Sequence, residues 1–454
     1  MSFYPYRQTE KIEFGLLILL ILLLLSGCQS RPAPTTPPEQ PPDNRTPTSG
    51  QPAAGLGNGP QPATVSDTPL TLWVPPFFSI DTENRADAVL AAALAEFAPT
   101  DSGVSVTLVP KAERGAAGVS VTLVPKAERG AAGLLAYLLT SQQSAPALLP
   151  DIVLLNSHDL LRAASAGIVP PLTEQERRPF AGIAPALLTS AEVDGLRYGL
   201  PFVADLDHLV YQKKRVLLPP IRLTDILAQD QQLLFAGGAV DEHSQSFAWT
   251  LYLTGGGGVD DQMRLTSPHA MAAAFDFLRV GRERGLIPDT ALTLSSAQAV
   301  WTFFANGDAE MAVVPASLYY NQQGEVGDIG FAPLPSLDGR PRSVITTWSF
   351  AVITQAPERR QQALRLLREM FEPQLHGEWS WSARQLPTQP EALTYWDTSD
   401  PYTLFLKEML TNSVSTPTSS ALGELTRAVQ QAQRMLLAGE ISTQGALDSL
   451  PFRP

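Results

Sequence analysis

Residues 198–213 read YGLPFVADLDHLVYQK. The stretch reads as extended chain, and it is long enough to leave one lobe of a protein and enter another. Residues 70–454, about 385 in number, exceed what a single core comfortably holds. We therefore predict two lobes, with residues 198–213 passing between them.

Strands and helices alternate before this stretch. We predict a strand at 70–74, a helix around 89–97, a strand in the run Val-Ser-Val-Thr-Leu-Val, a helix around 134–139 and a buried strand at 150–155. Such alternation is typical of a parallel α/β sheet.

After the stretch the pattern changes. Helical segments dominate from 223 to 284, and amphipathic helices are predicted around 363–371 and 422–436. Further strands are predicted at 310–314, 329–333 and 349–353. The glycine run 255–258 follows a predicted helix, so it indicates a helix stop and a loop.

The N-terminus predicts export. Residues 14–25 are almost entirely leucine and isoleucine, and they are fewer than the roughly twenty that a membrane-spanning helix needs. Leu25-Ser26-Gly27-Cys28 resembles the lipobox of bacterial lipoproteins, in which the cysteine is acylated and becomes the first residue. We expect residues 1–27 to be a lipoprotein signal peptide and Cys28 to anchor the protein by lipid on the extracytoplasmic side of the cell membrane. The alternative is a plain signal peptide with an incidental cysteine.

Composition narrows the possible partners. Residues 28–69 are rich in Pro, Gly, Thr, Gln and Ser, and they predict a disordered tether because they hold too little apolar surface to fold. Cys28 is the only cysteine, which excludes an internal disulfide. The net charge of −13 argues against nucleic acid and against anionic lipid headgroups as partners of the protein as a whole.

The sequence shows no catalytic motif. The five histidines, at 158, 208, 243, 269 and 376, lack the spacing of zinc ligands. There is no Gly-x-Ser-x-Gly elbow and no phosphate-binding Gly-x-x-x-x-Gly-Lys. If residues 204–207 are extended, we expect Asp205 and Asp207 to point to opposite sides, which would make them a poor acid/base pair. We therefore predict no enzyme, an exported glycoside hydrolase included, and neither a metal nor a cofactor.

Several short motifs, in this order and spacing, resemble the extracellular solute-binding proteins of ABC importers, in the family that includes maltose-binding protein. They are Pro150-Asp151-Ile152-Val153 with Ser157-His158-Asp159 and Ala166-Gly167-Ile168-Val169, Tyr198-Gly199-Leu200-Pro201 with Leu209-Val210-Tyr211, Phe304-Ala305-Asn306-Gly307-Asp308-Ala309-Glu310-Met311, Gly330-Phe331-Ala332-Pro333-Leu334-Pro335, and Leu386-Pro387. The resemblance covers essentially all of residues 70–454.

The resemblance implies an α/β, two-lobed periplasmic-binding-protein fold with a ligand cleft between lobes joined by hinge crossings. It implies a first lobe of residues 70–204 and 320–384 and a second of 207–314 and 388–454, with chain crossings near 204–206, 315–317 and 384–387. It also implies a small polar solute, a carbohydrate by family default, and the membrane subunits of an ABC importer as partners of a monomer. A tethered lipoprotein acting as a sensor or scaffold, without transport, is the alternative.

Candidate ligand-binding residues follow predicted strands or lie at the crossings, where aromatic faces and planar polar groups suit a sugar. They are Phe77, Phe78, Ser157, His158, Asp159, Asp205, Asp207, Trp249, Ser317, Tyr319, Trp348, Trp381 and Arg384. The competing interpretation is that each aromatic residue belongs to the core and that an aspartate at a crossing caps or braces the hinge. We assign Trp301 to the core.

One feature lies outside the resemblance. Residues 103–117 (GVSVTLVPKAERGAA) recur unchanged as residues 118–132. The sheet has one place for the strand that each copy encodes, so we predict the second copy in the sheet and the first looped out. A recent tandem duplication or an assembly error in the sequence would each explain the repeat.

Overall fold

The computed structural model describes residues 69–78, 86, 88–90, 121–128, 130, 132–239, 246–415 and 422–453. Thr64–Pro454 forms one compact unit and Met1–Ala63 another, and every element below belongs to the former. The predicted signal peptide, Cys28, nearly all of the tether and the first copy of the repeat lie outside the described residues.

The first part of the fold is the predicted parallel sheet. β1 (Leu70–Val74) lies between β2 (Val121–Pro125) and β3 (Ile152–Asn156) and is parallel to both. The connections include α3 (Leu134–Ser144), and α4 (Ser157–Ser165) follows β3. β2 belongs to the second copy of the repeat, which confirms the prediction for that copy.

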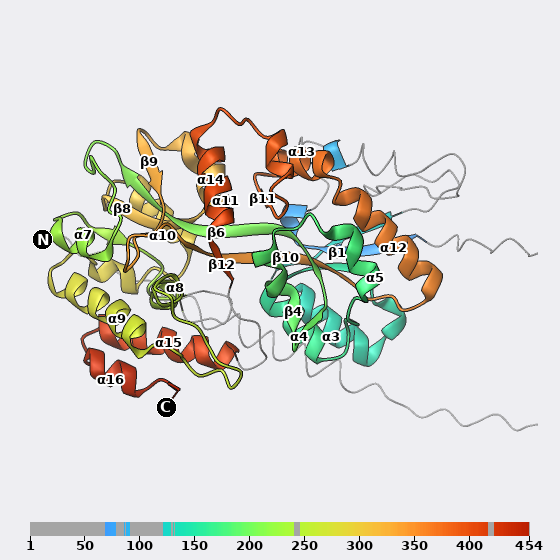
Figure 1. Cartoon of the computed structure of the whole chain (residues 1–454), viewed down its shortest axis with the longest axis horizontal. Coiled ribbons are helices and arrows are strands. Elements are labelled where there is room, and N and C mark those ends of the chain that lie inside the picture. Colours follow the sequence, from blue (N-terminus) through green and yellow to red (C-terminus); the bar gives the residue numbers. More distant parts are fainter. Residues whose placement is uncertain are drawn as a thin grey trace, which may run out of the picture. The chain divides into compact units, whose positions relative to one another are not determined.

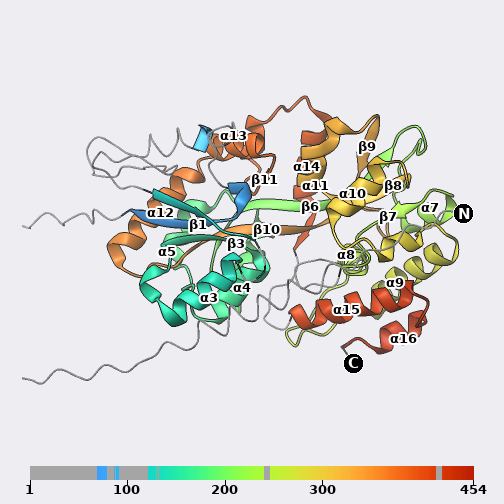
Figure 2. The same ribbon diagram turned by 180° about the vertical axis from the view of Figure 1, so that it is seen from behind.

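Two long antiparallel strands continue the sheet. β6 (Leu200–Gln212) confirms the extended segment predicted from the sequence, and it pairs with β10 (Ser343–Val352), which also pairs with β3. In Figure 1, β6 runs from the side of β1 and β10 to β8, and Figure 2 shows β3 between β1 and β10.

The far end of β6 carries a second group of strands. β8 (Met311–Pro315) and β9 (Ile329–Ala332) both pair with the residues of β6 from Asp207 onward, and β7 (Leu233–Leu234) pairs with β8. Helices pack around this group, and α9, α15 and α16 lie side by side in Figure 2. They are α7 (Leu223–Ala228), α8 (Phe247–Thr254), α9 (Pro268–Glu283), α10 (Ala297–Ala305), α15 (Leu422–Leu437) and α16 (Thr443–Asp448).

The remaining elements complete the two groups. α8 ends at Gly255, as the glycine run predicts. The remaining longer helices are α11 (Ala316–Gln322), α12 (Pro357–Met370), α13 (Pro373–Ala383) and α14 (Pro401–Thr411), and the short strands β11 (Leu386–Pro387) and β12 (Ser413–Ser415) pair with β6 and β10. The short ones are α5 (Glu174–Arg177), α6 (Pro185–Leu188), β4 (Glu192–Val193), β5 (Leu196–Arg197) and the 3-10 turns η1 (Pro76–Phe78), η2 (Pro146–Leu148), η3 (Arg178–Phe180), η4 (Thr189–Ala191), η5 (Asp289–Leu292), η6 (Gln323–Glu325) and η7 (Ala392–Tyr395).

The first sheet is buried on both faces, as its unbroken apolar runs predict. Val153 and Leu155 of β3 pack with α3 and α4, whereas Ile152 and Leu154 belong to the large core that also holds α12 and α13. Trp301 is buried in that large core, as predicted. Since side chains alternate along a strand, one strand serves both cores.

Candidate functional site

Four polar and aromatic side chains share one face of the β6–β10 pair, which we call the crossing face: Asp205, Asp207, Thr346 and Trp348. Asp205 pairs with Thr346 across the two strands, and residues two apart on a strand point to the same side. Thr346 is exposed and the other three are half-buried, although the residues between them are buried. The crossing face is thus a strip of reachable side chains on an otherwise buried pair of strands.

The expectation that Asp205 and Asp207 point to opposite sides is wrong. Side chains alternate with a period of two, so the residues on either side of Leu206 share a face. Burial, and then the negative charge of Asp205, raise the pKa of Asp207 to about 7. One carboxylate therefore influences the ionisation of the other, and near neutral pH the pair carries less than its full charge.

The side chain of Asp205 links strand β6 to helix α11. Its carboxylate accepts bonds from the backbone amide (3.1 Å) and the hydroxyl (2.5 Å) of Ser317, in the first turn of α11, and from its neighbour Leu206 (2.9 Å). Burial raises the pKa of Asp205, while the bonds from Ser317 oppose that rise. Asp205 and Ser317 therefore meet as a brace between β6 and α11, the competing interpretation that the sequence left open for an aspartate at a crossing.

An aromatic pair borders the crossing face. The rings of Phe77, which follows β1, and Trp348 meet edge to face with centroids 5.2 Å apart. Both side chains are half-buried. β3 pairs with the other edge of β10, and there Trp348 stands opposite Asn156, the last residue of β3. A partly exposed aromatic surface therefore lies beside the start of α4.

The start of α4 brings in two more predicted residues. Ser157 and His158 are half-buried in its first turn. A Cβ atom built on Gly423, in the first turn of α15, would lie 3.6 Å from Nε2 of His158. Residues that are far apart in the sequence therefore approach each other at His158. Asp159 is buried instead and accepts a bond from the side-chain amide of Asn156 (2.9 Å), so it serves the start of the helix.

Three candidates lie in the core in this conformation. Phe78 packs among Phe202, Phe350 and Trp379, and Trp249 is fully buried in α8, where its ring stacks on Tyr252. Tyr319 is buried against His208 and Tyr402. These side chains present no surface to a solute here, and their role is to pack the core.

Trp381 and Arg384 form a separate group around α11. Trp381 contacts the ring of Tyr320 at 5.6 Å, and the guanidinium of Arg384 lies 5.3 Å from the same ring while it donates to the Tyr320 carbonyl (2.6 Å). Arg384 ends α13 with a φ of 53°, in the left-handed region. These contacts fix the third predicted crossing to α11 and do not join the pair of Phe77 and Trp348.

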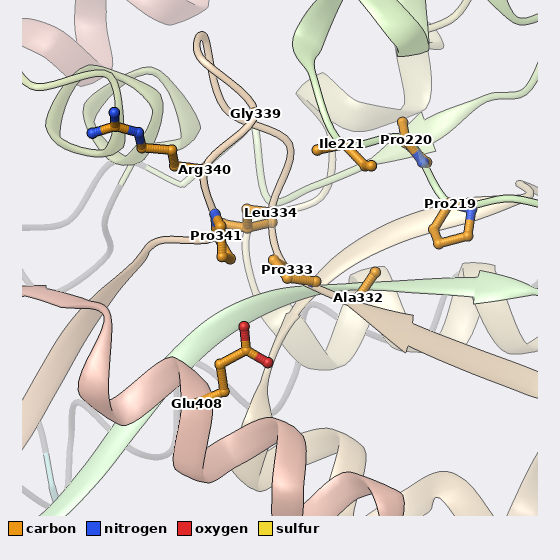
Figure 3. A pocket seen from close by; sticks show the side chains of 10 residues that line it. All are labelled: Pro219, Pro220, Ile221, Ala332, Pro333, Leu334, Gly339, Arg340, Pro341 and Glu408. Atoms are coloured by element: carbon orange, nitrogen blue, oxygen red, sulfur yellow. The ribbon is translucent and has the colours of Figure 1, made fainter.

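A pocket of about 310 Å³ lies elsewhere, beside the strand β9. Its lining is mostly apolar and contains none of the candidate residues, and Figure 3 shows proline and leucine side chains gathered between Ile221 and Glu408. It is lined by Pro219, Pro220, Ile221, Ala332, Pro333, Leu334, Gly339, Arg340, Pro341 and Glu408. With so few polar groups, this pocket does not suit a sugar.

Two residues of the site are absent from the predicted set. Thr346 and Asn156 could have been found from alternation and pairing, because they stand opposite Asp205 and Trp348. Within the described ranges, no group of three or more His, Cys, Asp or Glu side chains could hold a metal ion. Nor is any helix there long and apolar enough to cross a membrane.

Comparisons with known proteins identify the family. Residues 109–413 match the model of the bacterial extracellular solute-binding proteins. A search of curated proteins found no match to the sequence. Among solved structures, maltose-bound MalE3 of T. maritima is 17% identical, with 84% of this chain and 97% of that chain covered and a TM-score of 0.63.

Two further structures show the same fold. The cyclic α-maltosyl-1,6-maltose binding protein of Arthrobacter globiformis is 18% identical over 84% of this chain and 96% of that one, with a TM-score of 0.66. An ABC transporter solute-binding protein of Thermotoga lettingae, bound to α-D-tagatose, is 17% identical over 84% and 97%, with a TM-score of 0.62. The predicted two-lobed α/β fold is confirmed, and this chain belongs to the bacterial extracellular solute-binding protein family.

Proposed function

We propose that this chain is a lipid-anchored solute-binding protein that delivers a small polar solute, a carbohydrate, to the membrane subunits of an ABC importer. The observation that carries the proposal is the crossing face, where Trp348 and Phe77 stand beside carboxylates and a threonine hydroxyl. A sugar ring offers a C–H surface that stacks on an aromatic ring and hydroxyls that donate to carboxylates. The ligands of the similar structures, maltose and α-D-tagatose among them, agree with this chemistry.

Within this proposal, the solute contacts the half-buried residues near Trp348. They are Phe77, Ser157, His158, Asp207 and Trp348, together with the exposed Thr346. Asp205 holds α11 in place and thereby positions Asp207. We assign these aspartates to binding and not to catalysis. They lie on β6 where it passes between the two groups of elements, so a solute bound there would contact both groups and bring them together.

The pairing of β9 favours a lobe boundary that differs from the one implied by the resemblance. β9 pairs with the same end of β6 as β8 does, so residues 320–342 fit the second lobe better than the first. We propose that the chain returns to the first lobe along β10. This assignment moves the second crossing from 315–317 to β10, and we propose the other two crossings at 204–206 and 384–387.

The first prediction concerns solute binding by Trp348. A panel of maltodextrins, monosaccharides and polyols should contain a solute that raises the melting temperature and changes tryptophan fluorescence. At a hundredfold excess over Kd, binding to the native state adds about 2.7 kcal/mol. Trp348→Ala should abolish this response at the same solute concentration. It should weaken binding far more than it lowers the melting temperature, which falls somewhat because Trp348 also packs against both cores.

The control is Trp301→Phe, in α10, where the tryptophan is buried. It should lower the melting temperature and leave the solute response intact. A panel with no effect on the wild-type protein would count against carbohydrate binding. A Trp348→Ala protein that binds normally would remove Trp348 from the site.

A further inference from the structure

The turn after β6 exposes leucines in a way that nothing in solute binding requires. We call residues 213–222 (KKRVLLPPIR) the basic loop. Leu217 is 86% exposed, Leu218 79% and Ile221 64%. Large apolar side chains that are this exposed and lie next to each other indicate a surface that contacts a membrane or another protein.

The basic loop is held in shape at both ends. The amides of Arg215 and Val216 donate to the carbonyl of Gln212 (2.9 Å each), and the carbonyl of Ile221 accepts from Ser336 (3.1 Å). Val216 and Pro220 are buried on either side of the exposed leucines. Pro219 and Pro220 also line the apolar pocket, so the loop rests on a packed base (Figure 3). A loop that is ordered beforehand loses little entropy on contact.

The charge of the basic loop is opposite to that of the protein. Its charged residues are Lys213, Lys214, Arg215 and Arg222, whereas the chain as a whole carries −13. Lys213 and Arg215 pair with Asp328 (3.1 Å) and Glu310 (3.0 Å), but all four side chains are partly exposed, so solvent weakens these pairs. The carboxylate of Asp225 also accepts from the backbone amides of Ile221 (3.1 Å) and Arg222 (2.8 Å), so the four cations of the loop face three carboxylates and one positive charge remains in excess. A net positive, apolar tip on an acidic protein selects an anionic surface.

The composition of the basic loop favours a lipid surface over a protein as its partner. Cores of protein interfaces are poor in lysine, and their strongest contacts favour Trp, Tyr and Arg over leucine. Lysine and arginine beside exposed leucines instead suit a membrane interface, where the apolar groups enter the headgroup region and the cations meet anionic headgroups. We propose that the basic loop docks this protein on the anionic lipid surface of the membrane. The proposal rests on the export and lipid anchoring proposed above, since the anchor would keep the loop near that surface.

Sedimentation with vesicles tests the proposal without the anchor. Thr64–Pro454 is a compact unit that contains every described element, so this part can be used alone. It should bind vesicles that contain phosphatidylglycerol, bind pure phosphatidylcholine weakly, and be released by salt. Leu217→Ser with Leu218→Ser should weaken binding about tenfold or more. Lys214→Glu should weaken it at low salt only.

The matched control is Leu148→Ser with Leu196→Ser, which removes two other exposed leucines (68% and 50%). It should leave vesicle binding unchanged. No binding by the wild-type unit overturns the proposal, and so does equal loss in the control. A concentration-dependent dimer that the Leu217→Ser/Leu218→Ser protein lacks, without vesicle binding, would assign the loop to a second copy. The solute response of these variants reports separately on solute binding and should not change.

Discussion

At the scale of single residues, Asp207 and His208 are neighbours whose ionisation responds oppositely to burial. Burial raises the pKa of Asp207 to about 7 and lowers that of His208 to about 3, because both groups avoid charge away from water. Asp207 lies on the crossing face, whereas His208 points to the opposite side and packs against Tyr319 and Tyr402. As pH rises, the contribution of Asp207 to the free energy of unfolding therefore falls, whereas that of His208 increases.

We predict that Asp207→Asn stabilises the protein above neutral pH. The folded state holds a proton on Asp207 between about pH 4 and 7 that the unfolded state has released, so this group's contribution to stability falls as pH rises through that range. Because the carboxylate is partly exposed, the gain at pH 8 should be about 1–2 kcal/mol, well below the full value of the shift. Below pH 4 the difference from wild type should vanish.

Urea unfolding of both proteins at pH 3.5, 6 and 8 measures this difference, and the protonation of His208 cancels because it is common to both. A gain that is the same at all three pH values would show that Asp207 does not titrate as described.

At the scale of elements, the bond from Asp205 to the first turn of α11 ties a strand to a helix. We predict that Asp205→Ala destabilises the protein by about 1–3 kcal/mol, since it removes a helix cap and a charge-assisted bond. Ser317→Ala should cost less, because the backbone bond remains. Amide hydrogen exchange should rise in α11 first.

Asp400→Ala is the control. Asp400 caps α14 through Tyr402 and Thr403 (3.2 Å each), so its loss should loosen α14 and leave α11 protected. Equal exchange in α11 for both variants would contradict a local brace.

Elements also show what the sequence could predict. The apolar runs of β3 and β6 place them correctly, but β10 begins at Ser343 and not at Ser349 as predicted. Two of its early residues, Ser343 and Thr347, are polar and buried: the hydroxyl of Ser343 donates to the carbonyl of Asp207 (2.7 Å), and Thr347 bonds to Ser190 (2.6 Å). Those partners come from distant segments, so no local pattern reveals them.

The candidate site has the same limit. Phe77 and Phe78 are adjacent, and only the turn after β1 decides that Phe78 enters the core and Phe77 meets Trp348. The shared face of Asp205 and Asp207, in contrast, follows from strand alternation alone.

At the scale of the whole molecule, anchoring and folding should be separable. We predict that Cys28→Ser releases the protein from the membrane fraction or mislocalises it, because no acyl chain can be attached. The compact unit Thr64–Pro454 lies apart from Cys28 in the chain, so solute binding should persist. Fractionation of cells and the fluorescence assay check both halves. A variant that is processed and retained as before would refute the lipid anchor.

The duplicated segment gives the last prediction. β2 takes its residues from the second copy and pairs with β1 from Leu70 to Val74, so β1 needs only one copy on that side. Deleting residues 103–117 leaves a chain in which the single remaining copy still leads into α3. The connection between the helix near residue 90 and β2 becomes shorter by one copy.

Halving the length of a connection changes the free-energy cost of closing it by only about 0.6 kcal/mol. The deleted protein should therefore match the wild-type free energy of unfolding within about 1 kcal/mol and keep its solute response. It should also aggregate less, because an unpaired Val-Ser-Val-Thr-Leu-Val segment is a template for edge pairing. Urea unfolding and light scattering on heating measure the two effects. If the deletion prevents folding, the first copy is itself needed for the folded structure. The prediction that only the second copy has a structural role would then be wrong.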